Sequence, residues 1–213
     1  MRRREFIVSL GATVPWPLPA FAQQSAKPAR IGYLSPGSPN DPLGQRNRDA
    51  FRQGLNDLGH VEGQNLEIEY RFAERSFDRL PQLAAELVRL HVAVIAAGPT
   101  PAAVAAWNAT RTTPIVMINV GDPVGLGLVA SLARPGGNVT GLAFTVGTET
   151  FGKGLELFKE AVPGLHRVAV LFNPANPAHA LVLRDIQVVA RALSLELRPL
   201  EVRSVGDFEV LSA

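Results

Sequence analysis

Two short polar bends, each directly after an apolar run, hold the residue types best suited to binding a small solute. The first bend follows residues 92–97 and contains Gly98, Pro99, Thr100 and Pro101. The second follows residues 115–120 and contains Gly121 and Asp122. A helix starting at the first bend would offer N–H groups and a positive dipole end to a carboxylate, and the Asp122 carboxylate suits a cation. Together they could hold both ends of a zwitterion such as an amino acid.

Helix capping is an alternative explanation for both bends. Thr100 can cap a helix whose first turn holds Pro101. Asp122 followed by Pro123 is an equally good helix start. The residue types fit either role, so the sequence leaves ligand contact and capping open at Thr100 and Asp122.

The strands and the helix on either side of the two bends determine where the bends lie. Residues 92–97 and 115–120 are too short for helices, which predicts strands buried on both faces, and residues 102–109 form the crossover helix. This is a parallel βαβ unit. In open parallel sheets, ligands lie beyond the carboxyl ends of the strands, where both bends belong.

The same alternation runs through residues 30–145. Further strands are predicted at 30–35, 66–72 and 139–144, with 66–72 at the sheet edge because its apolar and charged residues alternate. Helices are predicted from 41 to a stop at Gly59, from 80 to 90 and from 124 to 133. Five strands alternating with helices predict an α/β fold with a doubly wound parallel sheet. Ser35 ends the first strand at the same edge as the two bends.

A second βα series occupies residues 146–213. The patterns predict a helix at 148–162, a strand at 167–172, a loop at 173–179, a helix through Leu193, a strand at 196–202 and the start of a helix after it. Two strands leave apolar surface uncovered, and two-stranded units are marginal alone. We therefore expect an incomplete second lobe and a fragment or truncated product.

Residues 1–22 have the parts of an export signal. Three arginines precede an apolar stretch, and Ala20 and Ala22 form a small-x-small cleavage site. Arg3-Arg4 resembles a twin-arginine signal, and a general secretory signal remains an alternative. We expect a periplasmic protein cleaved after Ala22, with residues 23–29 as a linker. Removing three Arg and one Glu from totals of 21 and 19 leaves 18 of each sign, so no charge excess points to nucleic acid.

Residues typical of catalysis, metal binding or cofactor binding do not cluster in this sequence. It contains no cysteine, which excludes disulfides, a thiol nucleophile and a lipid-modified cysteine anchor. The four histidines form no i, i+4 pair, and there is no G-x-S-x-G nucleophile elbow. We expect no catalytic residue, metal or cofactor.

Several stretches resemble the family of ABC transporter substrate-binding proteins that includes binders of tryptophan and other aromatic amino acids. They are RIGYLSPGSP, FRQGLNDLGHVEGQNLEIEYRFAE, GDPVGLGLVASLARPGGNVTG and RVAVLFNPANP. The resemblance implies a type I periplasmic-binding-protein-like fold of two flavodoxin-like lobes with ligand between them. The contacts that it implies come from Ser35, Gly98, Pro99, Thr100, Pro101, Gly121, Asp122, Asn173 and Asn176.

Other roles remain open for some of these residues. Asn173 and Asn176 each precede a proline and fit a turn equally well. Tyr33, Phe144 and Phe172 lie near strand ends, where they could stack on an aromatic ligand, but core packing is the expected role.

The function implied by the resemblance is capture of a small organic ligand, for example an amino acid, by a monomer. The protein would close around the ligand and deliver it to a membrane permease driven by an ATPase. An exported α/β enzyme and a ligand-sensing module for a receptor are alternatives, because a fold does not determine function.

Overall fold

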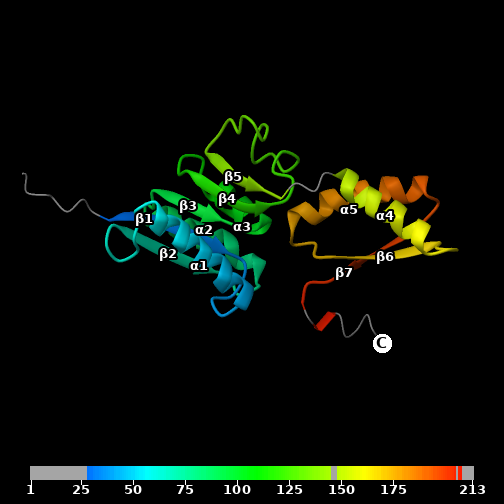
Figure 1. The fold of residues 1–213 in the computed structure, drawn as a ribbon, viewed down its shortest axis with the longest axis horizontal. Coiled ribbons are helices and arrows are strands. Elements are labelled where there is room, and N and C mark those ends of the chain that lie inside the picture. Colours follow the sequence, from blue (N-terminus) through cyan, green and yellow to red (C-terminus); the bar gives the residue numbers. More distant parts are fainter. Residues whose placement is uncertain (1–27, 145–147, 205, 208–213) are drawn as a thin grey trace, which may run out of the picture.

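Five parallel strands form the larger of two sheets in the computed structural model, which describes residues 28–144, 148–204 and 206–207 (Figure 1). The strands are β1 (Ala29–Ser35), β2 (Leu66–Phe72), β3 (Val94–Ala97), β4 (Ile115–Val120) and β5 (Val139–Ala143). Their order is β2-β1-β3-β4-β5, which is the flavodoxin-like order. The predicted doubly wound parallel sheet is confirmed.

Helices cover both faces of this sheet. Successive residues of a strand point to opposite sides, so apolar side chains lie on both faces and must be covered on each. Leu34, Ile95 and Ile115 pack under the helices on one face, and Ile31 and Tyr33 pack on the other against apolar side chains of the first helix. The helical elements are α1 (Pro42–Asp57), the short 3-10 helix η1 (Phe77–Arg79), α2 (Leu80–Arg89) and α3 (Thr100–Ala109).

The expected core role of Tyr33 is confirmed. Its side chain is buried, and its ring centroid lies 5.6 Å from that of Phe51 and 5.7 Å from that of Tyr70. This cluster fixes α1 against the outer part of the sheet.

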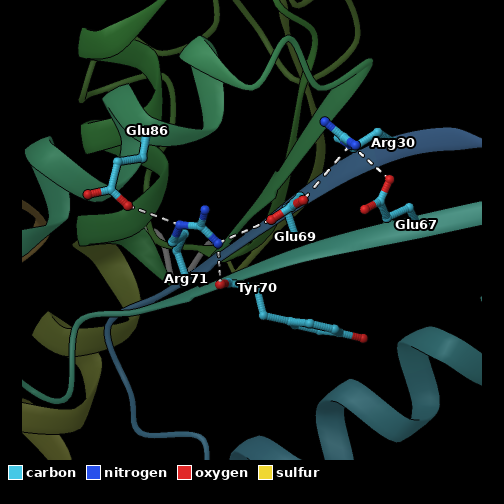
Figure 2. Close-up of polar contacts among 6 residues, drawn as sticks. All are labelled: Arg30, Glu67, Glu69, Tyr70, Arg71 and Glu86. Atoms are coloured by element: carbon cyan, nitrogen blue, oxygen red, sulfur yellow. Dashed lines mark hydrogen bonds and ion pairs between the residues drawn. The ribbon is translucent and has the colours of Figure 1, made fainter.

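Strand β2 lies at the sheet edge, as predicted, and its charged side chains form a chain of ion pairs (Figure 2). Arg30 Nε lies 2.9 Å from Glu67 Oε2, and Arg71 Nε lies 3.0 Å from Glu86 Oε2 on α2. The Tyr70 ring points to the opposite side of the strand. These ion pairs are partly exposed and therefore contribute modestly to stability, but charges along an edge strand discourage pairing with other chains.

The helix predicted at 124–133 is wrong, because residues 121–138 form turns. Gly127 N–H bonds to the Val124 carbonyl, and both Leu128 and Val129 N–H groups bond back to the Pro123 carbonyl. Gly127 then adopts a positive φ of 71°, which ends the turn. Leu128 and Val129 are buried, so apolar residues that suggested a helix face are core residues of a compact loop.

The second sheet contains two parallel strands, β6 (Arg167–Phe172) and β7 (Glu196–Glu201). The helices α4 (Thr148–Ala161) and α5 (Pro177–Ala192) lie on one face of it (Figure 1). Leu155, Ile186, Ala190 and Leu195 form its buried cluster. The elements predicted here are confirmed up to β7, except that α5 begins at Pro177, inside the loop predicted at 173–179. Most of the helix start predicted at the end of the sequence lies outside the described residues.

Apolar side chains stay exposed on this second unit. Leu171 on β6 is 50% exposed and Val188 on α5 is 64% exposed. The incomplete second lobe remains a prediction. None of the described helices combines the length and the apolar character that a membrane span requires.

Candidate ligand-binding site

A pocket of about 230 Å³ lies between the carboxyl edge of the five-stranded sheet and the helices of the second unit. The first side is formed by Pro99, Thr100, Asn119, Gly121, Asp122 and Phe144. The second side is formed by Phe151 of α4 and by Asn176, Ala178, His179, Leu181 and Val182 at the start of α5. Both predicted bends therefore line one concave site.

The bends meet because their strands are neighbours in the sheet. Ile95 pairs with Ile115 and Ala97 with Met117, so β3 and β4 run side by side and both lead to the same edge of the sheet. Gly98 then passes so close to β4 that an added Cβ would lie 2.1 Å from the Ile118 carbonyl oxygen. Only glycine allows this approach, which accounts for Gly98 by packing rather than by ligand contact.

A hydrogen bond joins the two bends. The Thr100 hydroxyl accepts the Gly121 N–H at 3.0 Å, and Thr100 is only 4% exposed. The bond crosses from the end of β4 to the start of α3. It holds the first-sheet wall of the pocket in one arrangement.

Helix capping, one of the two roles left open for Thr100, is not observed. Helix α3 begins at Thr100 itself, and the N-cap is Pro99, which makes no side-chain cap bond. The reason is tertiary, because the Gly121 N–H needs an acceptor where β4 ends and the Thr100 hydroxyl supplies it. Pro101 lies in the first turn, as predicted.

The N–H groups expected to receive an anion are already engaged. Gly121 donates to Thr100, and the N–H groups of Ala102 and Ala103 bond to the Pro99 carbonyl. The Gly121, Ala102 and Ala103 N–H groups are therefore not available to an anion.

Asp122 closes a turn and also lies in the pocket lining. Its Oδ1 accepts the Gly125 N–H at 2.8 Å and closes the turn that replaces the predicted helix. Its carboxylate is half-exposed in the pocket lining. A negative charge therefore lies beside the pocket although one oxygen is used by the backbone.

The other predicted contacts divide between the pocket and local structure. Pro99 and Asn176 are in the lining with the residues above, whereas Ser35, Gly98, Pro101 and Asn173 are not. The Ser35 hydroxyl accepts the Gly37 N–H at 3.2 Å. Asn173 Oδ1 accepts the Ala175 N–H at 2.9 Å, and Asn176 Oδ1 caps α5 by accepting the Ala178 N–H at 3.1 Å. The turn interpretation therefore describes both asparagines, and Asn176 also lines the pocket.

Four polar or aromatic residues of the lining were not among the predicted contacts, although stacking on a ligand was considered for Phe144. They are Asn119, Phe144, Phe151 and His179. The core role expected for Phe144 is wrong, since its side chain is 58% exposed. It follows the last residue of β5 and lies in the pocket lining, so the alternative considered for it from its place near a strand end fits the structure better than core packing.

His179 is held by the loop that precedes it. Its Nδ1 accepts the Asn173 N–H at 3.0 Å. Burial lowers the pKa of the imidazole below its ordinary value of 6.5. No group of three or more metal-ligating side chains occurs among the described residues.

Comparison with known proteins agrees with this fold. A sequence model of the ABC transporter substrate binding protein family matches residues 41–212. The tyrosine-binding protein of Clostridioides difficile (strain R20291) is 36% identical over 129 residues, which cover 61% of this chain and 36% of that protein. The chain thus spans about a third of the length of this curated relative.

Solved structures give the same result. A conserved domain protein from Vibrio cholerae superposes with a TM-score of 0.73 at 29% identity, over 86% of this chain and 60% of that one. An ABC domain in complex with L-Trp from Streptococcus pneumonia has a TM-score of 0.70 at 24% identity, over 85% and 59%. A leucine binding protein from Thermotoga maritima, at 14% identity and a TM-score of 0.62 over 86% and 53%, shares the fold alone. The chain therefore belongs to the ABC transporter substrate-binding protein family and has the α/β fold of type I periplasmic binding proteins.

Proposed function

We propose that this chain is the solute-binding component of an ABC importer and holds a small organic solute between two lobes, residues 30–145 and 146–213. The observation that carries this proposal is the pocket lined by residues at the edge of the five-stranded sheet and by residues of helices α4 and α5. A solute that contacts both sides favours the arrangement in which they are close, so binding shifts the population toward a closed form.

The chemistry of the lining favours an amino acid with an aromatic or large apolar side chain. Asp122 offers a carboxylate to an ammonium group, and Asn119 and Asn176 place amide groups in the same lining. Phe144 and Phe151 contribute exposed rings from opposite sides, and such rings favour stacked or edge-on contact with another aromatic group. The relative from Clostridioides difficile is named a tyrosine-binding protein, which supports L-tyrosine as the first probe.

The proposal extends to the rest of the transport cycle. Residues 1–22, outside the described residues, would direct export to the periplasm. The loaded protein would dock on a membrane permease whose ATPase drives uptake, and it would make or break no bond in the solute. Recovery of chemically unchanged solute after prolonged incubation with purified protein is the expected result, whereas turnover would favour an exported enzyme.

Substituting Asp122→Asn tests the carboxylate separately from the turn. Asparagine keeps an oxygen for the Gly125 N–H but removes the charge that would pair with an ammonium group. We expect L-tyrosine affinity to fall about tenfold, with a melting temperature within about 2 °C of the wild type. Calorimetric titration and thermal unfolding of the whole chain measure the two quantities.

Asp41 provides a matched control, because its carboxylate accepts the Gly44 N–H at 3.1 Å at the start of α1, outside the pocket lining. Asp41→Asn should leave L-tyrosine affinity unchanged. Unchanged affinity in Asp122→Asn together with a clear loss of thermal stability would leave Asp122 with a structural role alone.

A further inference from the structure

The bond to Asn173 determines which nitrogen of the His179 ring carries the proton. Nδ1 accepts the Asn173 N–H at 3.0 Å. A neutral imidazole has one donor and one acceptor nitrogen, so Nε2 is the donor. The ring is half-buried in the pocket lining. His179 can therefore present a neutral N–H donor to a molecule in the pocket.

The surrounding loop holds this ring without using Nε2. The Asn176 N–H bonds to the Asn173 carbonyl at 3.0 Å, and the His179 N–H bonds to the Asn176 carbonyl at 3.0 Å. The Asn173 side-chain oxygen accepts the Ala175 N–H of this loop, and the Asn176 side-chain oxygen accepts the Ala178 N–H in the first turn of α5. These bonds use the asparagine side-chain oxygens to position the ring, and they leave the Nε2–H of His179 available to the solute.

We propose that His179 determines specificity by donating Nε2–H to a carboxylate oxygen of the solute. This inference rests on the proposed function, in which Asp122 receives the ammonium group from the opposite side of the pocket. The ammonium and carboxylate groups of an α-amino acid are then bound by different lobes. A solute that lacks its carboxylate loses the contact with His179, and one that lacks its ammonium group loses the contact with Asp122.

Truncated probes separate this contact from general packing. We would compare L-tyrosine with tyramine, which lacks the carboxylate, in the wild type and in His179→Leu. The wild type should prefer L-tyrosine, and His179→Leu should weaken L-tyrosine binding about tenfold while leaving tyramine binding nearly unchanged. His179→Gln, which can place an amide N–H near the position of Nε2, should restore part of the preference. His60→Leu, an exposed histidine outside the pocket lining, is the matched control.

Each alternative result overturns a defined statement. Equal losses for L-tyrosine and tyramine in His179→Leu, or no loss for either, would overturn the inference and leave the proposed function intact. If the wild-type chain binds neither L-tyrosine nor tyramine, the proposed function for aromatic amino acids is overturned, and the inference with it. Imidazole ¹⁵N chemical shifts test the tautomer without any ligand, and a proton on Nδ1 at pH 7.5 would overturn the inference by itself.

Acid titration provides a further prediction that needs no ligand. Because burial lowers the pKa of His179 in the folded state, the unfolded chain binds a proton first as pH falls. The contribution of neutral His179 to stability is therefore complete above about pH 6.5 and is lost progressively below it. Protonation also removes the acceptor for the Asn173 N–H.

The wild type should consequently lose more thermal stability between pH 7.5 and pH 5.5 than His179→Gln does. Asp122 also lines the pocket, but it is present in both proteins, so its contribution cancels in the comparison. If the thermal stability of the two proteins falls equally with pH, protonation of His179 does not destabilise the folded state.

Discussion

Gly98→Ala is expected to destabilise the chain by about 3 kcal/mol, the largest effect among these substitutions. The new Cβ would lie 2.1 Å from the Ile118 carbonyl oxygen and 2.8 Å from the Ile118 Cβ. Both atoms are fixed by the backbone of β4, so the clash cannot be relieved by rotating a side chain. Relief requires β3 and β4 to separate where they carry the two bends of the pocket. Urea unfolding followed by circular dichroism measures the loss.

Gly54 supplies the control, because an added Cβ there meets nothing within 4 Å. It lies inside the exposed helix α1, where alanine is favoured over glycine by about 0.5–1 kcal/mol. Gly54→Ala should therefore stabilise the chain slightly. A Gly98→Ala protein as stable as the wild type would show that the close approach to Ile118 is not required.

Thr100→Val is expected to cost about 2 kcal/mol of stability. Valine has nearly the same shape but removes the hydroxyl that accepts the Gly121 N–H at 3.0 Å. Because Thr100 is only 4% exposed, water cannot readily replace the lost acceptor. Urea unfolding gives the free energy, and hydrogen exchange of the Gly121 amide should become faster.

Two control substitutions, a conservative one at Thr100 and one at an exposed threonine, are expected to cost less stability than Thr100→Val. Thr100→Ser keeps the hydroxyl and should cost less than about 1 kcal/mol. Thr140, which is exposed on β5, should tolerate valine within about 0.5 kcal/mol. Equal stability of Thr100→Val and Thr100→Ser would mean that the bond between the bends contributes nothing.

The elements of the five-stranded sheet were predictable because each carries its signal locally. The alternation along β2 and the short apolar runs of β3 and β4 report burial at the level of single strands. The stretch at 124–133 misled because its apolar spacing resembles a helix face. There, the Asp122 side chain, the Pro123 carbonyl and the positive φ of Gly127 favour a single compact turn.

The candidate site was predictable only in part. The placement of Gly121 and Asp122 at the carboxyl edge follows from a general rule for parallel sheets. The bond from Thr100 to Gly121 does not, because it joins residues 21 positions apart. Phe151 and His179 enter the pocket from the second unit, and no pattern near either residue reports what lies across the gap.

The sequence by itself determined the order and type of most elements, the parallel sheet and the sheet edge at which the two bends lie. The tertiary structure alone decided that Thr100 joins the two bends, that Phe144 leaves the core, and that His179 faces the pocket with a defined tautomer. The physical reason is the separation in sequence of the interacting residues, since strand and helix patterns arise from neighbours along the chain. Hydrogen-bond partners and pocket walls arise from groups brought together by packing.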